Sequence, residues 1–177
     1  MFRLRELERR DLTEINKWRN DPELINLLGA PFRYINYDVD VQWFENYMKS
    51  RNNAVRCAIV GDDDNIIGLV SLVPVDMLNQ SAEFHIMIGS KENQNKGCGT
   101  FAINEILRHA FMNTNLHRVE LGVLENNTRA RHLYEKAGFI QEGIKRGALF
   151  KGGKFVNKVM YSILREEYCI KYLQGGG

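Results

Sequence analysis

The chain has 177 residues, of which 44% are hydrophobic and 26% charged, with a formal net charge of +2. The length suits one ordinary domain, the composition is typical of a globular protein, and the charge is too small to predict nucleic acid as a partner. No apolar run approaches the roughly 18 residues that a membrane helix needs, and the early charges argue against a signal peptide. We therefore expect one cytoplasmic domain over residues 1–174, with no membrane partner, and a flexible glycine tail at 175–177.

The first predicted element is a strand at residues 2–6, where apolar and charged side chains alternate. Asp11 is a suitable N-cap for a helix that runs through Trp18, and Glu14 completes a capping-box pattern. The aromatic stretch at 31–37 has no periodic pattern, so we expect a loop there. Asp38 then introduces a second helix.

Apolar runs bounded by turn residues predict a sheet in the middle and at the end of the chain. Strands are expected at 55–60, 66–74, 82–89, 118–124, 139–150 and 155–164. Helices are expected over 99–113 and 128–137, the second of them ended by Gly138. This order, an antiparallel meander followed by alternating strands and helices, predicts an α/β domain with a mixed sheet covered by helices.

A glycine-rich loop from Gln94 to Thr100 joins a predicted strand to a predicted helix. Glycines allow a ligand to approach the backbone closely, and amides at a helix N-terminus bind anions, so the loop predicts a phosphate-bearing cofactor. Two alternatives stay open: a solvent-exposed turn, and the dinucleotide fingerprint G-x-G-x-x-A beginning at Gly97. The fingerprint is disfavoured because residues 90–96 separate Gly97 from the strand, and because Glu120, its candidate ribose ligand, lies inside a strand.

The segment from Asn127 to Phe139 has the spacing N-x-x-A-x-x-L-Y-E-K-x-G-F, and the glycine loop before it has the spacing Q-x-x-G-x-G. Together the two motifs resemble the GNAT superfamily of acetyl-CoA-dependent N-acetyltransferases, in the branch of ribosomal-protein N-terminal, spermidine and amino-sugar acetyltransferases. The resemblance implies a twisted, mostly antiparallel sheet of about seven strands with a central, parallel, splayed pair, flanked by four or more helices.

The resemblance also implies acetyl-CoA as cosubstrate. We expect no metal, because His109, His117 and His132 lack metal-ligand spacing. The pyrophosphate of coenzyme A would lie on the amides of the glycine loop, and the pantetheine arm would pair with the strand before it. The implied cofactor-binding residues are Ile86, Met87, Ile88, Gln94, Asn95, Lys96, Gly97, Cys98, Gly99, Thr100 and Asn127. Asn127 is also placed to cap the helix at 128–137, and the two roles are compatible.

Two catalytic residues are implied in the same way. Tyr134 matches the tyrosine near the thioester sulfur, where a hydroxyl donor eases departure of the thiolate; the alternative is a core aromatic. Glu83 matches the strand glutamate that takes a proton from the amine, usually through water, and His85 is a second base on the same predicted face. The alternative for both is an exposed polar pair. Cys98 is far from any candidate base, so we expect direct transfer in a ternary complex.

The acceptor region of this superfamily corresponds to the N-terminal helices and the loop between them. Its aromatic and basic side chains suit a nucleotide-linked amino sugar, whose base can stack and whose diphosphate can pair, although they could simply pack the helices onto the sheet. The candidate acceptor-binding residues are Trp18, Arg19, Phe32, Arg33, Tyr34 and His85. A protein N-terminal α-amine ranks second. Spermidine and other polyamines rank third, because they are more basic and call for carboxylates.

Two further possibilities remain. A non-catalytic acyl-CoA-binding domain would have the same fold, although the presence of Glu83, Asn127 and Tyr134 argues for a working site. The terminal hairpin could also pair with a second copy of the chain through its edge strand, which would form a homodimer.

Overall fold

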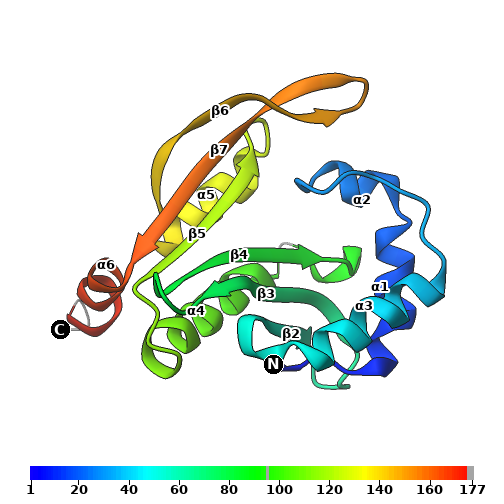
Figure 1. Cartoon of the computed structure of the whole chain (residues 1–177), viewed down its shortest axis with the longest axis horizontal. Coiled ribbons are helices and arrows are strands. Elements are labelled where there is room, and N and C mark those ends of the chain that lie inside the picture. The colour runs from blue at the N-terminus through cyan, green and yellow to red at the C-terminus, as the bar shows by residue number, and fades with distance from the viewer. Residues whose placement is uncertain (95, 175–177) are drawn as a thin grey trace.

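A computed structural model describes residues 1–94 and 96–174, and over these residues the chain forms one seven-stranded sheet (Figure 1). The expected tail at 175–177 lies outside the described residues. The strands are β1 (Arg3–Glu6), β2 (Val55–Val60), β3 (Ile66–Asp76), β4 (Ser81–Ile88), β5 (Arg118–Leu124), β6 (Ile140–Lys151) and β7 (Lys154–Leu164). Their order across the sheet is β1-β2-β3-β4-β5-β7-β6, and within the described chain only β4 and β5 pair in parallel. The predicted mixed, mostly antiparallel sheet is confirmed.

Helices cover the two faces of this sheet unequally. The helices of the described chain are α1 (Leu12–Arg19), α2 (Pro22–Asn26), α3 (Tyr37–Lys49), α4 (Cys98–Arg108), α5 (Thr128–Ala137) and α6 (Arg165–Cys169). Helices α1 and α3 lie over β2 and β3 on the face turned toward the viewer in Figure 1, which we call the front face. Helices α4 and α5 lie behind the sheet, on the back face.

Each helical layer buries its own apolar cluster, because each helix repeats apolar residues at helical spacing. On the front, Leu12, Ile15 and Phe44 pack with the apolar side chains of β2. On the back, Ile103 of α4 and Phe111 of the helical segment that follows it pack against β3, β4, β5 and β7. Among the described residues, none of the helices combines the length and the apolar character needed to cross a membrane.

The start of α1 differs from the prediction. Asp11 precedes α1 with helical backbone angles, but its side chain accepts no hydrogen bond from the first amides of that helix. Its carboxylate instead accepts one hydrogen bond from the Glu8 amide at 2.8 Å and two from Arg5, each at 2.8 Å. Asp11 therefore lies inside the first turn of a short 3-10 segment, and Glu14 does not complete a capping box with it. The expected N-cap was wrong because a strand arginine recruits this carboxylate.

Other boundaries move by a few residues. Helix α3 begins at Tyr37, because the Asn36 side chain accepts a hydrogen bond from the Val39 amide at 3.1 Å. Strand β3 continues through Pro74 to Asp76 and does not end at the proline. The short helices α2 and α6 were not predicted, since five residues are too few to show a helical period.

The parallel pair parts soon after it begins. In the described chain, β4 and β5 pair only at Ser81, Ala82 and Glu83, opposite residues 118–120, although β4 continues to Ile88 and β5 to Leu124. Figure 1 shows the two strands diverging from this point. The predicted splayed pair is therefore present, and it leaves one edge of β4 without a strand partner.

Candidate active site at the splayed strands

The unpaired edge of β4 begins where its register with β5 ends. Ile86, Met87 and Ile88 lie beyond the last paired residue, and each is half-buried. On the other edge, the same residues pair with Val70, Leu69 and Gly68 of β3, so the backbone of β4 is held straight. The amides and carbonyls on the β5 side are free to pair with an extended ligand, as they would with a strand. This edge fits the pantetheine arm of coenzyme A.

Tyr134 reaches the opening from α5, on the back face. Its side chain is 8% exposed, and its ring packs edge-to-face on Phe84 of β4, with the ring centroids 6.0 Å apart. Among the described residues the Tyr134 hydroxyl has no hydrogen-bond partner, yet it is not sealed from solvent. Burial raises the pKa of Tyr134 to about 12, so the hydroxyl keeps its proton at neutral pH. The group can therefore donate a hydrogen bond or a proton.

Glu83 and His85 lie on the front face of β4. The Glu83 side chain is 34% exposed and the His85 side chain 50% exposed, with 3.9 Å between Glu83 Oε1 and His85 Nε2. His85 Nε2 also lies 3.0 Å from the carbonyl oxygen of Val73. The predicted alternation of β4 holds, because Phe84 packs in the back cluster while Met87 packs in the front one. The two polar side chains are accessible from the front and not enclosed in the core.

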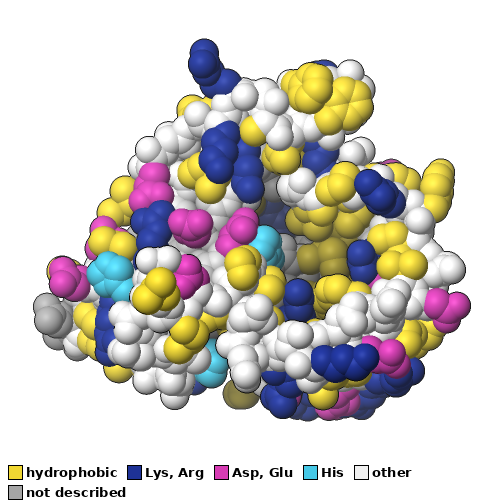
Figure 2. All heavy atoms as spheres, in the orientation of Figure 1, with side chains coloured by type: hydrophobic (Ala, Val, Ile, Leu, Met, Phe, Trp, Pro, Cys, Tyr) yellow, Lys and Arg dark blue, Asp and Glu magenta, His cyan; other side chains and the backbone are white. Residues whose placement is uncertain are grey.

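A lysine that was not predicted also reaches Glu83. Lys158 of β7 lies across β5 at Gly122, where a Cβ atom would meet Lys158 Cε at 1.8 Å. Its Nζ is 3.9 Å from Glu83 Oε1. No local motif marks Lys158, because its approach depends on the register of β5 with β7 and on the missing side chain at Gly122. Figure 2 shows this face hollowed at its centre, with acidic and histidine side chains on one side and hydrophobic side chains on the other.

The glycine loop leads directly into α4. Gly97 has a φ of +83°, which disfavours other residues, and a Cβ there would have nothing within 4 Å. A Cβ at Gly99 would lie 3.1 Å from Leu133 Cδ2, so this glycine lets α4 and α5 approach each other. Lys96 and Thr100 are exposed, and Gln94 Nε2 donates to the carbonyl of Ile88 at 3.4 Å. The space beside Gly97, at the start of α4, is therefore open, as binding of a pyrophosphate there would require.

Three other cofactor candidates have distinct positions. Asn95 lies outside the described residues. Cys98 is buried, and burial raises the pKa of its thiol to about 11, so a thiolate nucleophile is not available there at neutral pH. Asn127 caps α5, as expected, by accepting from the Ala130 amide at 3.1 Å, and it donates to the carbonyl of Leu27 at 3.0 Å. It therefore ties the start of α5 to the loop after α2.

The acceptor candidates are not brought together. Trp18 is 8% exposed and packs on Gly89, where a Cβ would lie 1.9 Å from Trp18 Cδ2. Arg19 forms an ion pair with the fully buried Asp40. Phe32 and Tyr34 pack edge-to-face with centroids 5.2 Å apart, and Tyr34 is 91% exposed. Trp18 is thus part of the front core, while the loop at 32–34, with exposed Arg33, faces solvent.

The tip of the terminal hairpin closes the far end of the opening. Lys151, at the end of β6, donates from Nζ to the carbonyl of Ile25 at 3.0 Å and also to the carbonyl of Ala30. These contacts join the C-terminal hairpin to α2 and to the loop after it, across the gap between the two halves of the sheet. Lys151 falls between the strands expected at 139–150 and 155–164, and no local motif marks it because its two partners lie more than a hundred positions away.

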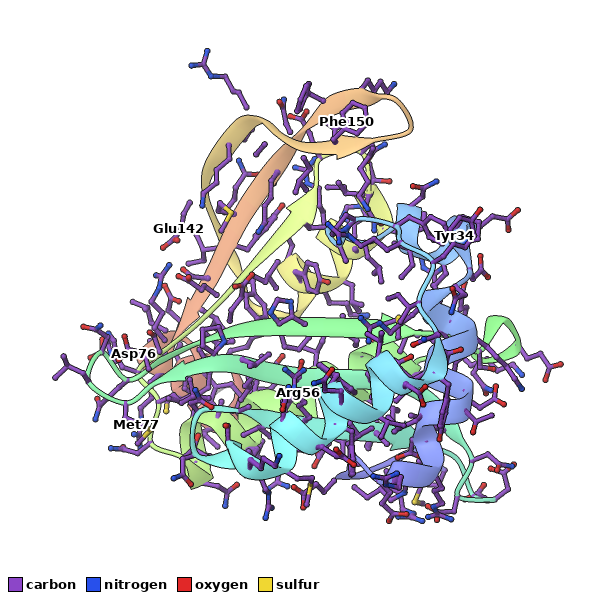
Figure 3. The ribbon with its side chains drawn as sticks, turned by 45° about the vertical axis from the view of Figure 1, so that its right-hand side comes forward. Tyr34, Arg56, Asp76, Met77, Glu142 and Phe150 are labelled. Carbon is purple, nitrogen blue, oxygen red and sulfur yellow. The ribbon has the colours of Figure 1, made fainter. Side chains whose placement is uncertain are left out.

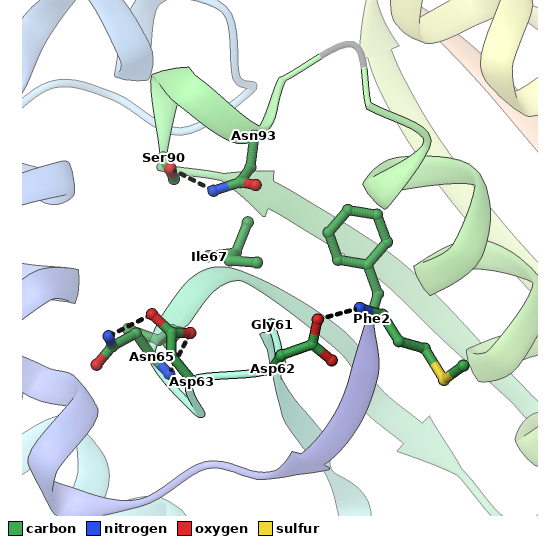
Figure 4. Close-up of a pocket in the computed structure, with 10 residues that line it drawn as sticks. Phe2, Gly61, Asp62, Asp63, Asn65, Ile67, Ser90 and Asn93 are labelled. Carbon is green, nitrogen blue, oxygen red and sulfur yellow. Dashed lines mark hydrogen bonds and ion pairs between the residues drawn. The ribbon is translucent and has the colours of Figure 1, made fainter.

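A cavity of about 500 Å³ lies elsewhere, between the start of β1, the β2–β3 turn and residues 90–93 (Figure 4). Its acidic side chains are already engaged: Asp62 pairs with the N-terminal amine at 2.6 Å, and Asp63 accepts from Asn65 Nδ2 at 2.7 Å. It has neither the unpaired strand edge nor Tyr134. Within residues 1–94 and 96–174, no three His, Cys, Asp or Glu side chains gather as a metal site.

The comparisons with known proteins agree with this geometry. A family model of the acetyltransferase (GNAT) domain matches residues 2–140. The spermidine N(1)-acetyltransferase of Vibrio cholerae is 34% identical over 168 residues, which cover 93% of this chain and 94% of that protein. The crystal structure of a Vibrio cholerae spermidine N-acetyltransferase in complex with CoA and spermine has a TM-score of 0.87 at 32% identity, covering 94% of this chain and 97% of that one.

A further solved structure, described as a dodecameric spermidine N-acetyltransferase from Vibrio cholerae, has a TM-score of 0.84 at 30% identity, covering 97% of this chain and 98% of that one. The chain therefore belongs to the GNAT family of acetyltransferases. It is an enzyme, an acetyl-CoA-dependent N-acetyltransferase, and the resemblance drawn from the two sequence motifs is confirmed.

Proposed function

We propose that the enzyme transfers the acetyl group directly to a primary amine of a small molecule that enters from the front face. The observation that carries this proposal is the parting of β4 and β5 between two reactive groups: Glu83 on the front and Tyr134 on the back. An acetyl thioester in the opening would be accessible to an amine from one side and to a proton donor from the other. The buried thiol of Cys98 gives no support to an acyl-enzyme.

In this proposal the backbone of Ile86–Ile88 pairs with the pantetheine arm, and the amides from Gln94 to Thr100 bind the pyrophosphate, assisted by Lys96. Asn127 orients the pantetheine from the start of α5. Bound acetyl-CoA supplies an activated carbonyl and a thiolate leaving group. Acetyl-CoA is a cytoplasmic metabolite, so we place the reaction in the cytoplasm.

Glu83 accepts a proton from the attacking amine, directly or through water, with His85 beside it. The amine nitrogen forms a bond to the acetyl carbon, the carbon–sulfur bond breaks, and Tyr134 donates its proton to the departing sulfur. The products are the N-acetylated amine and free coenzyme A. Glu83 then releases its proton to solvent and Tyr134 takes one up from solvent, so both groups return to their starting states.

The role of Glu83 can be tested by substitution. In Glu83→Gln we expect the profile of kcat/KM against pH to fall about tenfold or more at every pH, because the proton acceptor is lost, with the KM for acetyl-CoA unchanged. Glu105→Gln, in an exposed pair with Arg108 on α4, is the control. An unaltered profile in Glu83→Gln would remove this carboxylate from the mechanism.

We propose a primary amine as the acceptor, with the nucleotide-linked amino sugar first and a protein N-terminal α-amine next. The front opening offers few carboxylates for a polycation, since Glu120 and Glu142 are both engaged by Arg118 at 2.9 and 2.5 Å. A polyamine is the third candidate, and the named activity of the relatives favours it. Free-thiol release with spermidine, a nucleotide-linked amino sugar and a peptide N-terminus decides among them; release with none would favour a non-catalytic acyl-CoA-binding protein.

We also propose that copies of the chain associate through β6. This strand is at the edge of the sheet, is exposed over most of its length, and presents Ile140 and Ile144 at 55% and 48% exposure. Such an edge is a template for pairing with another chain. Light scattering of the protein and of Ile144→Lys tests it: an assembly that the substitution dissociates supports the proposal, and a monomer in both contradicts it.

A further inference from the structure

Arg56 has an unusual environment on the front face. It lies on β2 beneath α3, where Figure 3 labels it between the helix and the strands of the N-terminal half. Its guanidinium carbon is 4.8 Å from the ring centroid of Trp43 and 5.7 Å from that of Tyr47. Contact with the two aromatic rings holds the guanidinium in one position, although the arginine side chain is long and has several rotatable bonds.

The charge of Arg56 has no counterion in the described part of the chain. No carboxylate of these residues lies within 4 Å of it, and its buried Nε has no hydrogen-bond partner. Its two terminal nitrogens likewise make no hydrogen bond there, but they are not sealed from solvent. Burial lowers the pKa of Arg56, as expected for a charge without compensation.

Other partly buried arginines are compensated. Arg5 donates two hydrogen bonds to Asp11, and Arg118 engages Glu120 and Glu142. The carboxylate on the neighbouring helix, Asp40, is taken by Arg19 and by Asn16 Nδ2 at 2.7 Å. A half-buried guanidinium without a partner is costly, and the cost is offset when an anion binds.

The sheet register relates Arg56 to the catalytic end of the opening. Arg56 is paired with Ser71 on β3, and Ser71 with His85 on β4, so the three lie in one row across the front face. Two strand spacings separate the Cα atoms of Arg56 and His85 by about 10 Å. Glu83 follows on the same face of β4. The front of the sheet therefore has an uncompensated cation at one end and the candidate base at the other.

We propose that Arg56 binds an anionic group of the acceptor, so that the substrate is a primary amine carrying a phosphate or carboxylate within about 10 Å of its nitrogen. This inference rests on the proposed function and narrows its acceptor. A guanidinium presents parallel donors that match both oxyanions, whereas a polycationic acceptor would be repelled. Arg56 thus determines which amine is accepted, while the chemistry remains with the groups around the opening.

The test uses matched pairs of acceptors that differ only in the anion. One pair is an amino-sugar 1-phosphate and the free amino sugar; the other is a dipeptide and its C-terminal amide. With the unaltered enzyme, free-thiol release should favour the anionic member of at least one pair by tenfold or more in kcat/KM. Preference in the first pair identifies a phosphate, and preference in the second identifies a carboxylate.

In Arg56→Gln that preference should fall at least tenfold through the KM for the anionic amine, with the KM for acetyl-CoA and the rate with the uncharged member unchanged. Arg56→Lys keeps the positive charge but lacks the two parallel donors of a guanidinium. It should therefore retain part of the preference for the anionic amine. Arg108→Gln, an exposed helix arginine, is the control. If Arg56→Gln does not fold, Arg56→Lys alone carries the test: it keeps the charge but lacks the parallel donors, so the preference for the anionic amine should fall in part.

Equal use of both members of each pair, or better use of spermidine than of every anionic amine, would overturn the role of Arg56. Absence of thiol release from every amine would instead overturn the proposed function. The two failures are therefore distinguishable in one set of assays.

Discussion

The two halves of the sheet are covered differently. Strand β3, in the N-terminal half, is buried along most of its length because helices lie on both of its faces. Strand β6, in the C-terminal half, is exposed along most of its length, since α5 covers only the back of that half. The front face is therefore closed over β2 and β3 and open over β5–β7, and the boundary falls at β4.

This difference explains why the reactive groups come from opposite faces. Tyr134 lies on α5, behind the sheet. Glu83 points to the front, beside the half of the sheet that no helix covers on that face. A continuous sheet would separate them. The opening between β4 and β5 is the place where a donor behind the sheet and a base in front of it can reach one reacting centre.

The largest expected effect compares a core phenylalanine with one on the open half. Phe111 is fully buried behind the sheet, whereas Phe150 is 60% exposed at the hairpin tip. Phe111→Ala should lower the free energy of unfolding by about 3–5 kcal/mol, because it leaves a cavity. Phe150→Ala should change it by less than about 1 kcal/mol. Urea denaturation measures both, and equal losses would contradict the difference in covering between the two halves.

The next effect concerns the proton donor. Tyr134→Phe should lower kcat about 100-fold, with the Kd for acetyl-CoA unchanged, because the substitution removes only the hydroxyl. Tyr168→Phe is a matched control: Tyr168 is 4% exposed and stacks on Tyr172, away from the opening. Steady-state kinetics and calorimetry separate the two constants. Equal turnover in Tyr134→Phe and the unaltered enzyme would leave the hydroxyl without a role.

A smaller effect is expected at the glycine loop. Gly97→Ala places a side chain at a φ of +83°, which costs about 1–2 kcal/mol of strain or moves the loop. We expect the Kd for acetyl-CoA to rise about fivefold or more if the loop moves. Gly143→Ala on β6, with open space and no positive φ, should change neither stability nor affinity. Unchanged acetyl-CoA affinity in a stably folded Gly97→Ala would argue against the loop as the pyrophosphate site.

The smallest effect is a pH dependence of stability on the open half. Arg118 and the Ser162 hydroxyl hold the pKa of Glu142 at about 2, below its ordinary value of 4.5. The carboxylate therefore stabilises the fold fully above pH 4.5, and its contribution is lost as the pH falls toward 2. Since the side chain is 43% exposed, we expect less than about 1 kcal/mol. Unfolding of Glu142→Gln should differ from the unaltered protein at pH 7 and converge with it near pH 2.

Most of the sheet could be predicted because apolar runs and turn residues act locally. The strands at 55–60 and 118–124 begin and end where expected, and Gly138 ends α5 in a left-handed conformation. Local signals also predicted that the Asp11 side chain caps α1, which was wrong because Arg5 of β1 binds this carboxylate. The splayed pair was expected from the family resemblance and not from the periodicity of either strand.

The acceptor side was the least predictable part of the site. Trp18 was a candidate because aromatic residues can stack on ligands, but its position under Gly89 depends on packing between α1 and the end of β4. Arg56 was overlooked because a single arginine in a strand gives no motif. Its importance comes from Trp43 on α3, from Ser71 on the next strand, and from the absence of any carboxylate partner among the described residues.

The most direct test of the account is amide hydrogen exchange with and without acetyl-CoA. If the cofactor fills the opening, protection should appear at the backbone of Ile86–Ile88 and of residues 97–100, and β6 should exchange equally in both states. Protection confined to residues 61–65 and 90–93, around the cavity of Figure 4, with none along β4, would contradict the placement of acetyl-CoA between the splayed strands.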